Sequence, residues 1–235
     1  MQTLEQRWHS LWQRIYNAAL SAYPMASPPT LLAVSKTIPP TVIEAAYVLG
    51  QRHFAENYLQ EAIEKQSFLT ARHPDIVWHF IGAIQSRKCA VIAQHFDWVH
   101  SLDRAKIALL LNDARTNHLP ALNVCIQINI SSENSKSGLQ NLEDAKLLLD
   151  TINTLPNLHA RGLMGIAAPH LSLTKQHEQF AYLRHIFEEL KPYASPHWNV
   201  LSMGMSDDLE AAISEGATHL RIGSALFGSR QTLLK

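Results

Sequence analysis

Residues 31–57 read LLAVSKTIPPTVIEAAYVLGQRHFAEN and contain a strand, a helix and a second strand in succession. The short apolar run at 31–35 is typical of a buried strand, and the prolines at 39 and 40 end it. Residues 41–49 have a helical pattern, and residues 53–57 form the next short strand-like run. The segment therefore predicts a βαβ unit with two parallel strands and a right-handed crossover.

The same alternation continues along the whole chain. After an amphipathic helix over residues 2–22, we expect eight strands, at 31–35, 53–57, 77–82, 98–102, 124–130, 160–166, 200–203 and 218–223. Helical patterns lie between them, at 41–49, 58–70, 85–94, 103–116, 142–154, 173–190 and 207–215. Eight units fit a closed barrel better than an open doubly wound sheet. We predict a single α/β domain over residues 1–235, a (β/α)8 TIM-type barrel with the N-terminal helix of residues 1–22 packed on it.

Composition excludes several classes of protein. Apolar residues make up 46% and charged residues 17%, which suits one large core and leaves little for a disordered tail. Twenty basic residues balance twenty acidic ones without a basic cluster, so we expect no nucleic-acid partner. The thirteen histidines are scattered without metal-ligand spacing, so we expect no metal.

The cysteines and the N-terminus point to a cytoplasmic protein. Cys89 and Cys125 lack CxxC spacing, which indicates free thiols in a reducing compartment. Glu5, Arg7 and Gln13 interrupt the apolar residues at the N-terminus, so no secretory signal is expected, and no run is long enough to span a membrane. We also expect a monomer.

The barrel prediction directs attention to the residues that follow its strands. Active sites of such barrels lie at the C-terminal ends of the strands, on the loops that lead to the helices. Lys36 follows the first predicted strand, Asn57 ends the second, Ser202 lies near the end of the seventh, and Gly223 and Ser224 lie at the end of the eighth. We therefore expect segments that are distant in sequence to meet at one mouth of the barrel.

Lys36 is a candidate for a covalent bond to an aldehyde. Burial disfavours the charged form of lysine and lowers its pKa, which leaves more neutral amine to attack a carbonyl carbon. The alternative is a lysine that merely reaches the surface where its strand stops. The strand alone favours that alternative, whereas the rest of the chain favours a lysine that binds an aldehyde.

The motif HLRIGSALFG at residues 219–228 predicts an anion site next to Lys36. Alternation places Arg221 on the face opposite to Leu220 and Ile222, and therefore inside the barrel. Gly223 and the residues after it begin a short helical turn of the kind that binds phosphate in these barrels. A tight strand-to-helix turn and an arginine ion pair are the structural alternatives. Strands eight and one are neighbours in a closed barrel, so a phosphorylated aldehyde such as pyridoxal 5'-phosphate (PLP) would fit between the two.

Several motifs together resemble those of the pyridoxal phosphate homeostasis protein family. They occur in the family's order over residues 31–228 and comprise AVSK at 33–36, FAENYLQEA at 54–62, WHFIG at 78–82, INI at 128–130, KSG at 136–138, RGLM at 161–164 and LSMGMSDD at 201–208. The last of these, followed by RIGSALFG at 221–228, is the most specific.

The resemblance implies a single-domain barrel similar to the N-terminal domain of alanine racemase. It implies that Lys36 holds PLP as an internal aldimine and that Arg221 faces the pyridine nitrogen. The sequence departs from the family pattern at three positions: Ala55 replaces a usual glycine, Ala83 a usual proline and Arg87 a more common asparagine. The first two substitutions could alter loop shape, but they do not touch the implied cofactor anchors.

The resemblance also implies the remaining contacts to the cofactor. Ser202, Gly223 and Ser224 would bind the phosphate. Asn57 and Met203 would line the pocket around the ring. The family's role implies that PLP-dependent apoenzymes could be transient partners.

Two functions fit these residues. The first is a non-catalytic protein that holds PLP, and the alternative is a PLP-dependent amino acid racemase of weak or narrow activity. A racemase needs a second acid or base opposite its lysine. In the resembled racemases a tyrosine from a second domain and a partner subunit supplies it, whereas here Tyr58, at the start of a helix, is the nearest tyrosine to a strand end. We therefore expect a protein that is not an enzyme.

The sequence also suggests structural roles for His79, Glu56 and Lys136. His79 shares a strand face with Val77 and Ile81, and we favour a core histidine bonded to a carbonyl over an inward polar group. Glu56 should point away from the Asn57 side, which favours a structural salt bridge over a general base. Loop 131–138, with Lys136, fits a solvated connection better than a lid.

Overall fold

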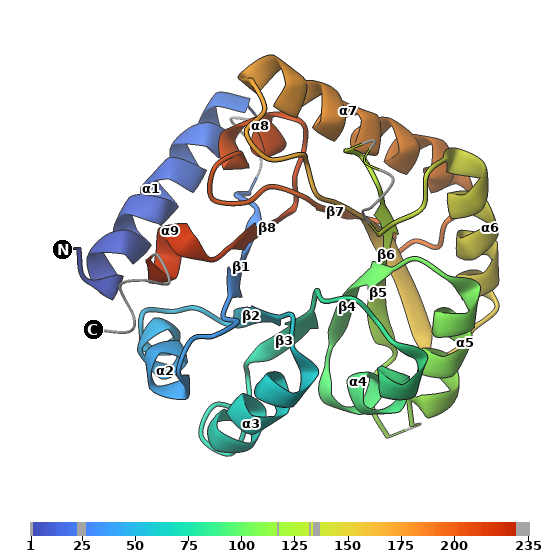
Figure 1. Cartoon of the computed structure of the whole chain (residues 1–235), viewed down its shortest axis with the longest axis horizontal. Coiled ribbons are helices and arrows are strands. Elements are labelled where there is room, and N and C mark those ends of the chain that lie inside the picture. Colours follow the sequence, from blue (N-terminus) through green and yellow to red (C-terminus); the bar gives the residue numbers. More distant parts are fainter. Residues whose placement is uncertain (1, 23–26, 117, 132, 134–136, 229–235) are drawn as a thin grey trace.

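Eight parallel strands form a closed barrel in chain order, with β8 paired to β1 (Figure 1). The structure is a computed structural model that describes residues 2–22, 27–116, 118–131, 133 and 137–228. The strands are β1 (Thr30–Val34), β2 (His53–Glu56), β3 (Val77–Phe80), β4 (Trp98–Leu102), β5 (Leu122–Ile128), β6 (Leu158–Gly165), β7 (Val200–Ser202) and β8 (His219–Ile222). The predicted barrel is confirmed.

Helices surround the strands in a ring, and α1 lies beside α8 and α9 (Figure 1). They are α1 (Leu4–Ala22), α2 (Pro40–Val48), α3 (Leu59–Leu69), α4 (Cys89–His95), α5 (Ala105–Ala114), α6 (Leu142–Asn153), α7 (Leu173–Leu190), α8 (Leu209–Ser214) and α9 (Ser224–Phe227), with 3-10 turns η1 (Ser86–Lys88) and η2 (Lys191–Tyr193). The helix predicted over 85–94 is thus a 3-10 turn followed by a short α-helix. The N-terminal helix is present as predicted.

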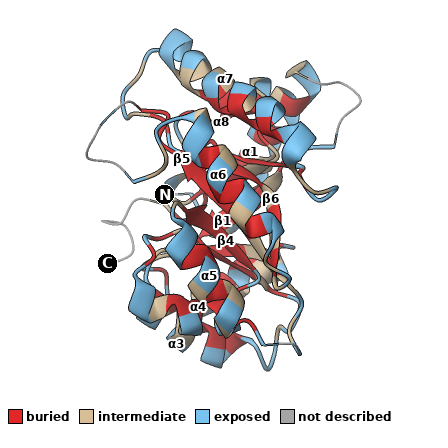
Figure 2. Cartoon of the chain, turned by 90° about the vertical axis from the view of Figure 1, so that its right-hand side faces the viewer, coloured by how far each residue is buried: buried red, intermediate tan, exposed pale blue. Residues whose placement is uncertain are grey.

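The main apolar core lies between the strands and the helices (Figure 2). In α1 the buried residues are Trp8, Leu11, Ile15 and Ala19, a spacing of three and four that gives the helix one apolar stripe. That stripe explains why a helix outside the repeating βα units packs against the barrel. Figure 2 shows the same division on the ring helices, whose outer faces are exposed and whose inner faces are buried.

The interior of the barrel is unusually polar. Such interiors are commonly filled by branched aliphatic side chains. Here two small apolar groups, Leu32–Val34–Ala55 and Trp98–Cys125–Met164–Val200, are accompanied by buried polar residues. The fully or almost fully buried polar residues on the inward faces are His79, His100, Ser202 and Arg221. Buried polar groups need hydrogen-bond partners, and these residues find them in one another.

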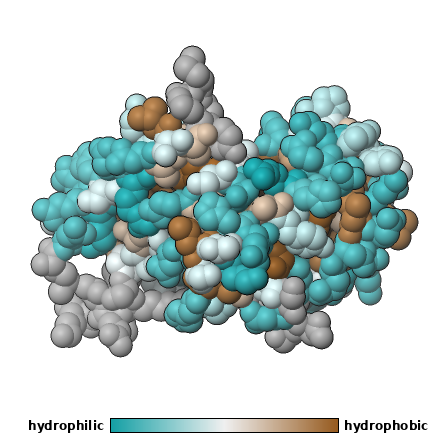
Figure 3. Space-filling view, turned by 90° about the horizontal axis from the view of Figure 1, so that it is seen from above, coloured by the Kyte–Doolittle hydropathy of each residue, from teal (hydrophilic) through white to brown (hydrophobic). Residues whose placement is uncertain are grey.

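The surface and the thiols add two findings. Seen from above, the molecule presents mostly hydrophilic residues with smaller hydrophobic patches among them (Figure 3). None of the helices in the described part of the chain is long and apolar enough to cross a membrane. Cys89 and Cys125 are both buried free thiols, and burial raises the pKa of Cys125 to about 12.

Candidate functional site

A pocket of about 360 Å³ opens at the C-terminal ends of the strands. Its walls come from the loops after β1, β2, β3, β6, β7 and β8, as expected for a barrel of this type. The lining residues are Val34, Lys36, Thr37, Ile38, Asn57, Ile81, Met164, Ile166, Met205, Ser206, Asp207, Arg221, Gly223, Ser224, Phe227 and Gly228.

Five of the seven predicted site residues meet in this pocket: Lys36, Asn57, Arg221, Gly223 and Ser224. The pairing of β1 with β8 sets Ala33 opposite Ile222 and Leu32 opposite Arg221, so the ends of the two strands lie side by side. A lysine, an arginine and a Gly-Ser turn that are almost 190 residues apart in sequence are thereby brought to one cavity.

The other two predicted residues, Ser202 and Met203, lie outside the pocket lining. Ser202 is fully buried in the barrel interior, where its hydroxyl contacts Arg221 and His100. Met203 points the other way and is buried in the apolar core between strands and helices. The structure therefore does not bring either side chain to the Gly-Ser turn, although Ser202 supports Arg221 from below.

Ser206, which sequence reasoning missed, occupies the place expected for Ser202. Its hydroxyl accepts a hydrogen bond from the Ala225 backbone N–H at 3.2 Å and lies 3.0 Å from the Ser224 hydroxyl. The sequence held a usable signal, because loops after strands carry the sites of these barrels and Ser206 follows β7 whereas Ser202 ends it.

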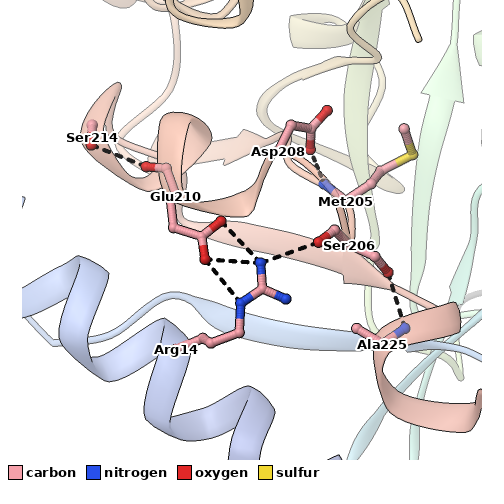
Figure 4. A network of polar contacts seen from close by, with 7 residues as sticks. All are labelled: Arg14, Met205, Ser206, Asp208, Glu210, Ser214 and Ala225. Atoms are coloured by element: carbon pink, nitrogen blue, oxygen red, sulfur yellow. Dashed lines mark hydrogen bonds and ion pairs between the residues drawn. The ribbon is translucent and has the colours of Figure 1, made fainter. Parts of the chain in front are cut away.

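The loop that carries Ser206 is held from two sides (Figure 4). Asp208 accepts a hydrogen bond from the Met205 backbone N–H at 2.5 Å. From the other side, Arg14 of α1 donates to the Ser206 carbonyl at 3.3 Å and forms an ion pair with Glu210 of α8 at 2.8 Å. The N-terminal helix thus fixes a wall of the pocket.

Arg221 provides a fixed positive charge at the pocket. Its Nη1 donates to the carbonyl of Ser202 at 2.6 Å and to the hydroxyl of Ser202 at 2.9 Å, and its Nη2 donates to the Gly165 carbonyl at 2.8 Å. Burial lowers the pKa of Arg221 to about 10, an effect that nearby Asp208 opposes. The guanidinium therefore stays protonated at neutral pH.

Below Arg221 lies a chain of histidines. The ring nitrogens of His53 and His79 are 3.0 Å apart, those of His79 and His100 are 2.9 Å apart, and His100 Nδ1 lies 2.9 Å from the Ser202 hydroxyl. Burial holds the pKa of His79 and of His100 well below the ordinary value, so both are neutral. The expectation that His79 bonds a carbonyl is wrong, because strands β2 and β4 place imidazoles on both sides of it.

Asn57 approaches the pocket over a glycine. A Cβ added to Gly82 would lie 2.1 Å from the Asn57 carbonyl oxygen, so only glycine lets the segment after β3 pass this close. The Oδ1 atom of Asn57 is buried and has no hydrogen-bond partner among the described residues. Asn57 is therefore the one pocket-lining residue among those described with a buried side-chain acceptor that lacks a protein partner.

Glu56 forms a buried salt bridge with Lys65 at 2.8 Å, as predicted. Tyr58 is 53% exposed and is absent from the pocket lining. Lys136 lies outside the described residues.

Comparisons with known proteins agree with this geometry. The family model described as alanine racemase, N-terminal domain, matches residues 14–231. A protein of Pseudomonas aeruginosa named pyridoxal phosphate homeostasis protein is 50% identical over 230 residues, which is 98% of this chain and 97% of its relative. The protein of the same name from Escherichia coli K12 is 50% identical over 202 residues, 86% of each chain.

Solved structures give the same result. PipY of Synechococcus elongatus, described both without PLP and with PLP bound, is 36% identical, with TM-scores of 0.85 and 0.82 over 96% of this chain and all of PipY. Alanine racemase from Bacillus anthracis is 17% identical, with a TM-score of 0.65 over 92% of this chain and 56% of the racemase, and shares the fold. This chain belongs to the pyridoxal phosphate homeostasis protein family.

Proposed function

We propose that this protein binds PLP in the pocket at the barrel mouth and holds it through a Schiff base to Lys36. The observation that carries the proposal is the meeting of Lys36, the buried cation of Arg221 and the serine-lined turn in one cavity of about 360 Å³. PLP bears an aldehyde, a ring nitrogen and a phosphate, and these three groups match the three kinds of residue. The relative PipY, whose structure is described with PLP bound, supports PLP as the ligand.

Each part of the pocket then has a role. Lys36 supplies the amine that condenses with the aldehyde carbon, and the carbonyl oxygen leaves as water. Arg221 faces the ring nitrogen. Ser206, Gly223 and Ser224 form the end that receives the phosphate, and Asn57 lines the pocket beside the ring.

We further propose that the protein holds PLP without substantial turnover. PLP supplies enzymes with an electron sink for carbanions. A fixed cation such as Arg221 beside the ring nitrogen disfavours protonation of that nitrogen and weakens the sink. Among the described residues that line the pocket, Asp207 is the only carboxylate, and no tyrosine, histidine or cysteine accompanies it. The lining thus offers little for proton transfer opposite Lys36, which fits storage and transient delivery to PLP-dependent apoenzymes.

Replacing Lys36 tests the covalent bond. The protein with PLP should show the absorption band of an imine, and Lys36→Ala should lose it. Borohydride reduction followed by peptide mass analysis should place the adduct on Lys36 in the unchanged protein. Lys36→Arg is the matched control, because it keeps a cation but cannot form the imine. An adduct on another lysine of the unchanged protein would refute the assignment.

Isotope exchange tests the absence of turnover. We expect the protein with PLP to exchange the Cα hydrogen of L-alanine or L-serine in deuterated water no faster than free PLP at the same concentration. Faster exchange, or formation of the D-isomer, would instead establish the racemase alternative.

A further inference from the structure

The backbone that carries Lys36 is a strained turn. The Ile38 N–H donates to the Ser35 carbonyl at 2.9 Å, which closes a four-residue turn with Lys36 and Thr37 at its centre. Thr37 has φ of 65°, and Thr37 and His170 are the only residues other than glycine with positive φ in the described chain. A turn with positive φ at its third residue favours glycine, and a β-branched threonine is unfavourable there. Surrounding contacts must therefore hold this turn in place.

A buried ion cluster supplies those contacts. Lys65 of α3 is 4% exposed, and its ammonium donates to the Ser35 carbonyl at 2.6 Å and to the carboxylates of Glu56 and Glu61. Glu61 in turn accepts the N–H of Thr37. The Ser35 hydroxyl donates to Glu56 at 2.6 Å.

These contacts fall on the two peptide units that flank Lys36. The Ser35 carbonyl belongs to the peptide bond before Lys36, and the Thr37 N–H belongs to the peptide bond after it. One charge network behind the barrel wall therefore grips both sides of the Lys36 Cα atom. Its remaining anchor, Glu56, immediately precedes Asn57 of the pocket.

General stabilisation of the barrel does not explain the cluster well. A buried ion pair often stabilises a fold no more than apolar side chains of similar size would. The charged groups instead form directional hydrogen bonds. The ammonium binds a carbonyl and the carboxylate binds an N–H, and an apolar side chain would leave both without partners.

We infer that Lys65, acting with Glu56 and Glu61, is the positioning residue of the cofactor lysine. It holds the strained Ser35–Ile38 turn so that the Lys36 amine enters the pocket. The inference rests on the proposed function, since it concerns the lysine that would bind PLP.

Lys65→Met is the first test, because methionine has similar length and no charge. We expect PLP to bind about tenfold more weakly and the imine band to rise correspondingly more slowly. A tenfold loss of affinity corresponds to the energy that strain at one residue stores. Arg115→Met is the matched control. Arg115 is also 4% exposed and donates to the carbonyls of Phe96 and Pro120, away from the pocket. This control should lose stability and keep wild-type PLP affinity and imine rate.

Thr37→Gly separates positioning from general stability. Glycine adopts positive φ without strain, so adding Thr37→Gly to Lys65→Met should recover most of the lost affinity and rate. Glu61→Gln, which removes charge but keeps an acceptor for the Thr37 N–H, should show a smaller loss and serves if Lys65→Met does not fold. The Glu61 side chain is already 28% exposed, so this substitution disturbs the buried cluster less than Lys65→Met does.

The results also separate this inference from the proposed function. If Lys36→Ala abolishes the imine band while Lys65→Met and Glu61→Gln bind PLP at wild-type affinity and rate, the positioning role is refuted and the function stands. Equal losses in Lys65→Met and Arg115→Met, or no recovery with Thr37→Gly, would also refute it. If Lys36→Ala keeps the band, the proposed function itself fails.

Discussion

Arg221 and Ser202 share two hydrogen bonds, and together they set the direction of the series of hydrogen bonds that runs through the barrel interior. Arginine only donates, so the Ser202 hydroxyl accepts from Nη1 of Arg221. A hydroxyl can accept twice, but among the described contacts only His100 Nδ1 can take the hydroxyl proton, so we expect Ser202 to donate to His100. A neutral imidazole has one donor and one acceptor. His100 therefore donates from Nε2 to His79 Nδ1, and His79 donates from Nε2 to His53 Nδ1.

Ser202→Ala should disturb this order. We expect the free energy of unfolding to fall by about 1–3 kcal/mol, because His100 Nδ1 and one Arg221 N–H lose a buried partner. In the wild type, imidazole ¹⁵N spectra should show His100 protonated at Nε2. Ser101→Ala is the control, since that buried hydroxyl donates to the Gly82 carbonyl at 2.5 Å and should leave the His100 spectrum unchanged. A His100 protonated at Nδ1 in the wild type would contradict the predicted direction.

The buried histidines should also make stability depend on pH. Burial lowers the pKa of His79 and of His100 well below the ordinary value and that of His219 to about 3. Below about pH 6.5 the unfolded chain then binds more protons than the folded one, so stability falls as the pH drops from there toward the folded pKa values. Burial raises the pKa values of Asp97 and Asp208, so these two groups favour the folded state as the pH falls. Their effect belongs to the acidic range in which carboxyl groups titrate, below the range of the histidines.

Each histidine that is neutral when folded and charged when unfolded contributes about 1.4 kcal/mol per pH unit in that window. Urea unfolding at pH 7.5, 6.5 and 5.5 measures how the free energy of unfolding changes with pH. His79→Gln should reduce the number of protons taken up on unfolding by about one. A stability that stays constant from pH 7.5 to 5.5 would show that the histidines are not held neutral.

The fold was largely predictable from sequence, because strand and helix periods recur eight times. All eight strands lie where the apolar runs predicted them, but several end earlier. Residues 35, 57, 81–82, 129–130, 166, 203 and 223 were assigned to strands and lie instead in the segments that follow them. Near a strand end, apolar pattern continues into the loop, and only the hydrogen-bond register decides where pairing stops.

The site was predictable in part for a related reason. Alternation gives the face on which a side chain lies, so Arg221 was correctly expected inside the barrel. It does not give the level along the barrel axis, so Ser202 was expected beside the Gly-Ser turn although it lies below Arg221. The partners of His79 depend on which residues of β2 and β4 stand next to it, and that register is set by the closed sheet as a whole.

Gly223 offers a test of where the phosphate binds. A Cβ added to Gly223 would meet Val34 at 3.5–3.6 Å, an ordinary contact, so protein packing does not require glycine there. We expect Gly223→Ala to change the free energy of unfolding by less than about 1 kcal/mol and to weaken PLP binding about tenfold, because the methyl group narrows the pocket.

Gly162→Ala is the contrasting variant. Gly162 has φ of 152°, and a Cβ there would lie 1.8 Å from the Val200 carbonyl oxygen, so this variant should unfold readily. Thermal unfolding and PLP titration of both variants separate a packing glycine from a ligand-facing one. Wild-type PLP affinity in Gly223→Ala would place the phosphate elsewhere.

Arg14 tests whether the N-terminal helix contributes to the pocket. Its ion pair with Glu210 is exposed, with 42% and 50% of the two side chains accessible, so Arg14→Ala should cost at most about 1 kcal/mol of stability. The loop that it holds carries Ser206, however, so we expect PLP binding to weaken several-fold and the difference from wild type to shrink at high salt. Arg72→Ala removes a similarly exposed pair with Glu44 on the α2–α3 side and should leave PLP affinity unchanged. Equal affinities for the two variants would mean that α1 stabilises the barrel without shaping the site.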